Sequence, residues 1–150
     1  MLRGCIGTFE PKSLAINLPT YTLISAFKDS RFPPIKSEEV NLLKCSVSLL
    51  HSFEEAKNAY DWEVGKHGMQ IEFKVAEKEY HSTYLPEVAK EQNWNQQKTI
   101  KSLIKKAGYS GEQTEELINS IKIKRYQSQK CSAEVKEYIE FMNSNHNFFT

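Results

Sequence analysis

The chain has 150 residues, which is enough for one domain or for two small subdomains that share a core. Its 20 basic and 19 acidic residues nearly cancel, which argues against a general nucleic-acid or membrane-surface binder. Three widely spaced cysteines, without a CxxC or HxxxH pair, argue against a disulfide framework and a structural zinc site, and no other cofactor is indicated.

The first 56 residues predict two strands, two helices and a helical turn. The opening segment 2–9 (LRGCIGTF) predicts a strand that carries Arg3 and Cys5 on one face. Residues 10–17 are interpreted as a loop, and Pro19 as the start of a helix. This helix is predicted to end at Arg31 and Phe32, because the double proline 33–34 cannot continue it. A helical turn at Ser37, a strand over 45–50 with one buried face, and a helix from Ser52 to Ala56 follow.

The remaining two thirds predict a hairpin and several helices. Residues 61–68 are interpreted as a structured loop, followed by strands 69–75 and 79–84 as a hairpin. Helices are predicted to begin at Pro86 and to cover 96–107 and 112–118. A strand over 121–127 precedes a helix from Ser132 with Val135, Tyr138, Ile139 and Met142 facing inward, and 143–150 form a tail. This order predicts an α+β fold with a mainly antiparallel sheet and flanking helices.

Six segments in this order resemble the AMMECR domain, named for the Alport syndrome, midface hypoplasia and elliptocytosis chromosomal region. They are residues 2–9, 25–34, 45–50, 61–68, 83–92 and 124–128. The resemblance is strongest to the eukaryotic branch. It implies one AMMECR domain over residues 1–142, built as two interlocked subdomains with a cleft between them, and no established activity.

The resemblance also concerns the region before the first motif. Family members normally carry several dozen residues upstream of the LRGCIG segment, whereas this chain starts at that segment. We therefore expect an exposed sheet edge or an apolar surface beside residues 2–9.

Cys5 is the candidate nucleophile. Arg3 would stabilise its thiolate if the two side chains converge, and His67, in the glycine-flanked segment 65–68, is a candidate base. The alternative for Cys5 is a small buried side chain between close-packed glycines, which we favour. The alternative for His67 is a ring nitrogen that bonds to the backbone and fixes the loop, and the two interpretations are evenly matched.

Three further charged residues are candidates for the site. Glu87 is a candidate acid or base, although its place at a helix start is explained by the helix dipole. Arg31 is a candidate anion ligand, but a salt bridge with Asp29 at the helix exit is the favoured alternative. Arg125 and Tyr126 lie on opposite strand faces, so only one of them faces the cleft; Arg125 is the candidate binding residue, and Tyr126 is the alternative.

Two functions remain open. The first is an intracellular regulatory or protein-interaction module with an unidentified protein partner. The second is an enzyme that uses Cys5, on a nucleotide or RNA substrate. Lysines 98 to 106 form a basic stripe that RNA can use, although such a stripe is more often a solvated helix face. No apolar run approaches 18 residues and no signal-peptide pattern follows Met1, so we expect no membrane partner and a cytoplasmic or nuclear location.

Overall fold

The computed structural model describes residues 1–145 and divides the chain into two compact units. Unit 1 contains residues 1–47 and the segment from 131 onward, whereas unit 2 contains residues 48–130. The chain therefore leaves unit 1 once and returns to it once. This interleaving along the sequence agrees with an organisation in two subdomains, while a cleft between them stays a prediction.

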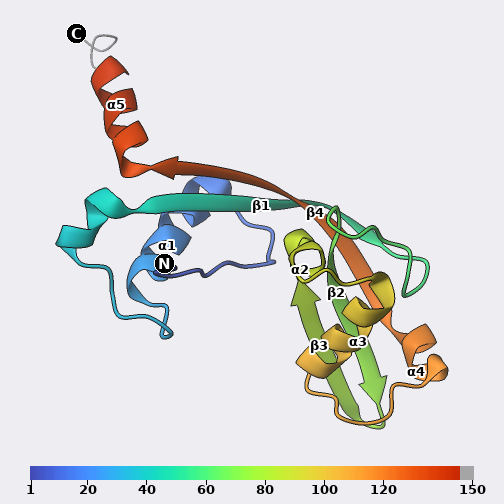
Figure 1. Cartoon of the computed structure of the whole chain (residues 1–150). Coiled ribbons are helices and arrows are strands. Elements are labelled where there is room, and N and C mark those ends of the chain that lie inside the picture. Colours follow the sequence, from blue (N-terminus) through green and yellow to red (C-terminus); the bar gives the residue numbers. More distant parts are fainter. Residues whose placement is uncertain (146–150) are drawn as a thin grey trace. The chain divides into compact units, whose positions relative to one another are not determined.

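One four-stranded sheet supplies the β part of the fold (Figure 1). Its strands are β1 (Lys44–Glu55), β2 (Gly68–Val75), β3 (Lys78–Tyr84) and β4 (Lys122–Glu134), in the order β1-β4-β2-β3. The strand β2 pairs antiparallel with β3, where Met69 faces Tyr84, and antiparallel with β4, where Gly68 faces Tyr126. The predicted hairpin and the predicted α+β class are confirmed.

Unit 2 holds every buried apolar side chain of the described residues. Its helices are α2 (Pro86–Glu91), α3 (Gln96–Lys106) and α4 (Glu115–Ser120). In α3 the apolar residues recur every three to four positions, and that face packs on β3, where the Ser82 hydroxyl donates to the Leu103 carbonyl at 2.7 Å. The core residues are Ala59, Trp62, Met69, Ile71, Phe73, Ala89, Ile100, Leu103, Ile104, Ile118, Ile121 and Ile123.

Tyr126 joins three strands of unit 2. Its side chain is fully buried and its ring stacks on Phe53 of β1 at 5.1 Å. Its hydroxyl donates to the Tyr84 carbonyl of β3 at 3.0 Å. The ring lies directly over Gly68 of β2, where an added Cβ would come within 2.5 Å of the ring carbon Cζ. Gly68 is therefore required by the packing of Tyr126.

Unit 1 is held together by polar contacts. It contains the helix α1 (Leu14–Phe27), the short 3-10 helix η1 (Ser37–Leu42) and the helix α5 (Val135–Asn145). Among its described residues no apolar side chain is buried, and its one buried residue is Asp29. The Val135 amide donates to the Leu43 carbonyl at 3.3 Å, which connects the start of α5 to the end of η1.

The predicted opening strand is wrong. Residues 1–9 form no strand, because side chains bind the backbone groups that a neighbouring strand would take. The Ile6 amide donates to the Ser25 hydroxyl at 2.9 Å, and Gly4 lies so close to the Ser25 carbonyl that no Cβ would fit. The expected sheet edge is therefore absent from this segment, whereas the expected apolar surface is present, since Leu2, Ile6 and Phe9 are exposed.

Several predicted boundaries also differ from the structure. α1 begins at Leu14, inside the predicted loop, includes Pro19, and ends at Phe27, four residues before the predicted end at Arg31. No helix follows Ser52, because β1 continues to Glu55, and β1 shows no buried face. β4 extends through Ser132, so α5 starts later than predicted and continues through 143–145, part of the predicted tail. The inward side chains predicted for α5 are half-buried at Val135 and exposed at Tyr138, Ile139 and Met142. Residues 146–150 of the predicted tail lie outside the described residues.

Candidate functional site

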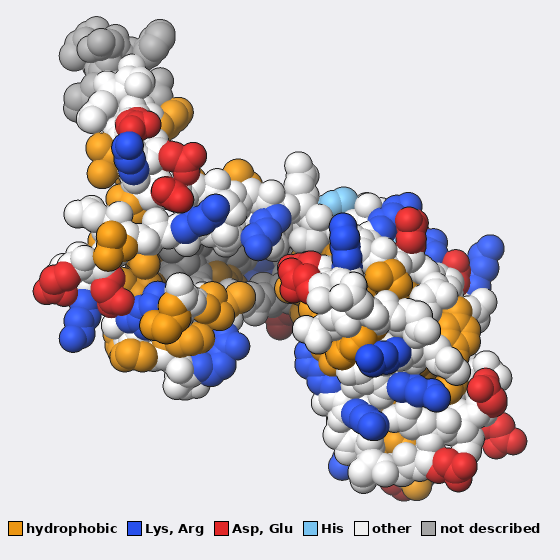
Figure 2. All heavy atoms as spheres, viewed as in Figure 1, with side chains coloured by type: hydrophobic (Ala, Val, Ile, Leu, Met, Phe, Trp, Pro, Cys, Tyr) orange, Lys and Arg blue, Asp and Glu red, His pale blue; other side chains and the backbone are white. Residues whose placement is uncertain are grey.

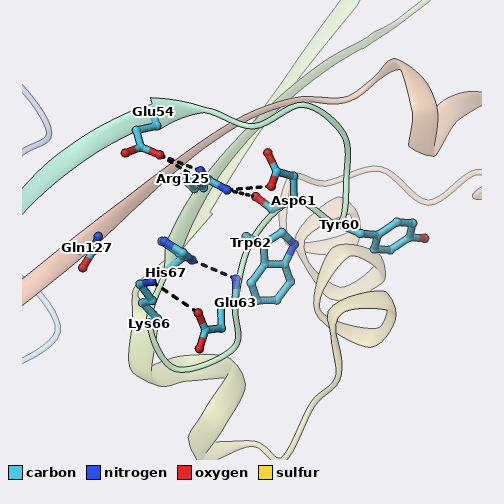
Figure 3. A pocket seen from close by; sticks show the side chains of 9 residues that line it. All are labelled: Glu54, Tyr60, Asp61, Trp62, Glu63, Lys66, His67, Arg125 and Gln127. Atoms are coloured by element: carbon cyan, nitrogen blue, oxygen red, sulfur yellow. Dashed lines mark hydrogen bonds and ion pairs between the residues drawn. The ribbon is translucent and has the colours of Figure 1, made fainter.

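A polar pocket of about 450 Å³ lies at the start of β2 in unit 2 (Figure 3). The long loop between β1 and β2 forms most of its wall, and β1 and β4 complete it. Its lining residues are Glu54, Tyr60, Asp61, Trp62, Glu63, Lys66, His67, Arg125 and Gln127. Of the six residues selected from the sequence, His67 and Arg125 are brought together here.

Arg125 of β4 binds both β1 and the loop between β1 and β2. Its Nε and Nη2 donate to Glu54 Oε2 at 3.1 and 2.8 Å, and its Nη1 donates to the carbonyl and the carboxylate of Asp61 at 2.7 and 2.9 Å. These contacts raise the pKa of the guanidinium, chiefly through its hydrogen bond with Glu54. The pKa of Asp61 is lowered, first by the hydrogen bond from the Lys57 amide and then by Arg125. Arg125 therefore has two carboxylate partners of its own within the pocket.

His67 fixes the turn at the end of the same loop. Its Nδ1 accepts a hydrogen bond from the Glu63 amide at 3.0 Å, and the Glu63 carbonyl accepts one from the His67 amide, also at 3.0 Å. Partial burial lowers the pKa of the imidazole, and the nearby charges of Arg125 and Lys66 lower it further. A neutral ring whose Nδ1 accepts must carry its proton on Nε2.

This tautomer limits the chemistry available to His67. A general base needs a free lone pair, and the lone pair of Nδ1 is already used by the loop. The neutral ring instead offers the pocket an N–H donor at Nε2. The interpretation of His67 as a loop-fixing residue therefore has direct geometric support.

Cys5, Arg31 and Asp29 form a separate polar cluster in unit 1. The buried Asp29 carboxylate accepts from Arg31 Nε and Nη2 at 2.9 and 2.7 Å and from the Cys5 amide at 2.9 Å. Arg31 Nη2 also donates to the Cys5 carbonyl at 2.8 Å. The hydrogen bond from Arg31, followed by that from the Cys5 amide, holds the pKa of Asp29 well below its usual range. The favoured prediction of an Asp29–Arg31 salt bridge is confirmed.

The thiol of Cys5 is exposed, so the favoured prediction of a buried cysteine is wrong. Of the two glycines on either side of Cys5, only Gly4 is closely packed, because a Cβ on Gly7 would meet no atom within 4 Å. Arg3 is also engaged elsewhere. Its Nε and Nη2 bind the two Glu39 carboxylate oxygens at 2.7 and 2.9 Å, and this bidentate pair lowers the pKa of Glu39 to about 2.

The remaining candidate, Glu87, lies in the first turn of α2 directly after Pro86. It does not line the pocket, and its position agrees with a carboxylate placed at the positive end of a helix dipole. No sequence pattern indicated Glu54 or Glu39 as partners of Arg125 and Arg3, because both pairs are separated by more than thirty positions. Such pairs become visible only once the fold is known.

The described residues offer no group of three His, Cys, Asp or Glu side chains that could hold a metal ion. Within residues 1–145, no helix has both the length and the apolar character needed to cross a membrane.

A family model described as AMMECR1 matches residues 1–131. An uncharacterized protein of Arabidopsis thaliana is 44% identical over 145 residues, covering 95% of this chain and 68% of the relative. An uncharacterized protein of Schizosaccharomyces pombe is 46% identical over 140 residues, covering 92% of this chain and 70% of the relative. This chain therefore spans about two thirds of the length of these relatives.

The fold has a solved counterpart. The crystal structure of an uncharacterized protein from Pyrococcus horikoshii resembles this chain with a TM-score of 0.67 and 26% identity, covering 88% of this chain and 65% of that one. The family match spans both units, and the predicted resemblance is confirmed. This chain belongs to the AMMECR1 family.

Proposed function

We propose that this chain is a protein-interaction module that binds an apolar segment of a partner polypeptide through unit 1. The observation that carries the proposal is the distribution of apolar side chains. Every buried apolar residue of the described chain lies in unit 2, whereas 15 of the 18 exposed large apolar residues lie in unit 1. A large amount of exposed apolar surface is characteristic of regions that bind other molecules.

The helix α1 is the centre of this surface. It has no charged residue, and its apolar side chains point to opposite sides. At 100° per residue, Leu14 and Leu18 lie on one side of the helix, and Ile16, Leu23 and Phe27 lie on the other; all five are exposed. Segment 2–9 runs beside α1 and adds Leu2 and Ile6. We call these seven residues the unit 1 apolar surface, and Figure 2 shows hydrophobic side chains gathered on the visible face of this unit.

The chemistry of this surface defines the partner. A helix that exposes apolar side chains on two opposite sides is normally covered by other polypeptide on both, because neither side faces water favourably. A charged ligand would find no counter-charge along α1. The fitting partner is therefore an uncharged apolar segment that covers the helix from two sides.

Site-specific cross-linking tests the proposal in cells. A photoreactive p-benzoylphenylalanine replaces Leu23, which is 59% exposed, and in a control chain it replaces Leu49 of unit 2, which is 38% exposed. A discrete product is expected from position 23 alone. The captured protein is then purified and titrated with the unaltered chain and with Ile16→Asp, Leu23→Asp and Leu49→Asp variants.

The two unit 1 substitutions are expected to weaken binding of the purified partner at least about tenfold, because each places a charge against an apolar contact, whereas Leu49→Asp changes it less than about twofold. Equal cross-linking from both positions, or equal affinity of all variants, would refute the proposal. Circular dichroism of each variant separates loss of binding from loss of folding. If the cross-linked product contains only two copies of this chain, the surface binds a second copy rather than a partner protein, and the proposal is overturned.

The enzyme hypothesis rests on the exposed thiol of Cys5. Unit 1 contains no histidine among its described residues, and Arg3 is bound to Glu39. The other two thiols, Cys45 and Cys131, are exposed as well and serve as internal standards. Alkylation of Cys5 more than about tenfold faster than of these two cysteines would favour the enzyme, because a catalytic thiol is more reactive than an ordinary one. Comparable rates favour the interaction module.

A further inference from the structure

We propose that the exposed side of α3 in unit 2 binds the phosphate backbone of single-stranded RNA. The proposal concerns Lys98, Lys101, Lys105 and Lys106, which we call the α3 basic face. It is independent of the unit 1 apolar surface, because it lies on the other unit and requires charge rather than apolar contact.

The α3 basic face is a local excess in a chain of balanced charge. Residues 92–111 contain these four lysines and no acidic residue, although the whole chain has 20 basic and 19 acidic residues. All four side chains are exposed, and none forms a salt bridge with another described residue. Figure 2 shows Lys and Arg side chains gathered over the α3 region. Lys98, Lys101 and Lys105 lie within about 60° of one another around the helix, opposite its buried side.

Helix stability does not explain this pattern. Lys105 and Lys106 lie in the last turn, where a cation favours the helix dipole. Lys98 lies in the first turn, where a cation opposes the dipole, and the first turn has no acidic residue to offset it. Lys101 and Lys105 form a like-charge pair four residues apart, which is destabilising in an isolated helix. Positions that violate local stability rules are often functional.

Two of the four ammonium groups are positioned by aromatic rings. Lys106 Nζ lies 4.5 Å from the centre of the Tyr84 ring and donates to the Thr83 carbonyl at 2.7 Å, and partial burial lowers its pKa. Lys98 Nζ lies 5.7 Å from the Trp94 ring, which is half-buried and 6.0 Å from the Tyr84 ring. The face therefore combines positioned cations with aromatic side chains.

The residues beside the lysines favour a nucleic acid over an acidic peptide. Segment 92–97 has the sequence QNWNQQ, with five amide side chains and one tryptophan. Gln92, Asn93 and Gln97 are exposed, so their amides can both donate to and accept from bases and sugars. A polyglutamate or polyaspartate segment would use only the lysines, whereas single-stranded RNA would use lysines, amides and an aromatic surface together.

Fluorescence anisotropy of the full chain with a labelled single-stranded RNA of about twelve nucleotides tests the proposal. Raising the salt from about 50 to about 200 mM is expected to weaken binding about 50-fold, from four phosphate contacts and a slope of about −0.7 per contact. The variant Lys98→Gln/Lys101→Gln/Lys105→Gln removes three of these contacts and is expected to reduce the salt effect to about threefold. Its affinity at the lower salt concentration should fall at least about tenfold.

The matched control removes the same charge from other exposed lysines of unit 2. The variant Lys74→Gln/Lys78→Gln/Lys122→Gln is expected to change RNA affinity less than about threefold, since these lysines lie outside the α3 basic face. Equal losses in both variants, or an unchanged salt slope, would overturn the proposal. Displacement of the RNA by polyglutamate at an equal concentration of charge would also overturn it, because the face would then be specific for charge alone. Circular dichroism and a thermal melt of the α3 variant, compared with the unaltered chain, separate unfolding from lost binding.

Discussion

Replacing Gly68 with alanine tests the packing at the centre of unit 2. The added Cβ would lie 2.5, 2.6 and 2.9 Å from Cζ, Cε2 and the hydroxyl oxygen of Tyr126. The ring cannot yield without losing its stack on Phe53 or its hydrogen bond to Tyr84. Overpacking of this kind costs about 1–3 kcal/mol, and a lost hydrogen bond adds about 1 kcal/mol.

We therefore expect Gly68→Ala to lower the free energy of unfolding of unit 2 by about 2–4 kcal/mol. Urea denaturation should show an earlier midpoint with an unchanged slope. Gly7→Ala is the matched control, because a Cβ on Gly7 meets no atom within 4 Å, and its expected effect is within about 0.5 kcal/mol.

A double-mutant cycle identifies the cause. In a Tyr126→Leu background the smaller side chain leaves room for the alanine methyl, so Gly68→Ala should cost less there than in the unaltered chain. If Gly68→Ala is tolerated as well as Gly7→Ala, or if its cost is the same with and without the Tyr126 ring, the steric reasoning is refuted.

Three further predictions concern other parts of the chain. The pKa of His67 is lower in the folded chain than its usual 6.5, so the folded state favours the neutral ring. The contribution of His67 to the free energy of unfolding is therefore fully present above about pH 6.5 and is lost as the pH falls. Thermal melts between about pH 7.5 and 5.5 should show this decline, and it should shrink in His67→Gln. Leu103→Ala should destabilise unit 2 by about 2–5 kcal/mol, whereas Leu23→Ala on the exposed α1 should have an effect within about 0.5 kcal/mol, both measured by urea denaturation. Asp29→Asn removes the charge that binds Arg31 and the Cys5 amide, so hydrogen exchange of the Cys5 amide should accelerate; an unchanged rate would show that the charge of the carboxylate does not protect this amide.

The spacing of apolar residues correctly predicted those helices and strands that bury one side of a single element. The alternation over 69–75 and the three-to-four spacing in 96–107 predicted the hairpin and α3 correctly, because each reflects one buried side of a single element. The opening segment failed for a non-local reason. Its alternation suits a strand, but Asp29, Arg31 and Ser25 bind the backbone of Cys5 and Ile6 and replace a strand partner.

The candidate site was predictable to a similar extent. The glycines around His67 indicated a tight turn, and its ring does bond to the backbone there. That Arg125 lines the same pocket depends on the return of β4 to β1 across more than fifty intervening residues, which no local pattern encodes. The exposure of Cys5 was missed because a short motif with two glycines does not reveal which glycine is closely packed.

The chain passes between the two units at two points, and their positions determine which unit can be expressed by itself. Both junctions, near residues 47 and 131, fall within β1 and β4, which are neighbours in the sheet. Segment 48–130 therefore enters and leaves through adjacent strands, as an inserted domain does, and it carries the complete apolar core. Expressed by itself, this segment should form a cooperative folding unit, whereas unit 1 is assembled from two stretches that meet only after the intervening segment has been synthesised.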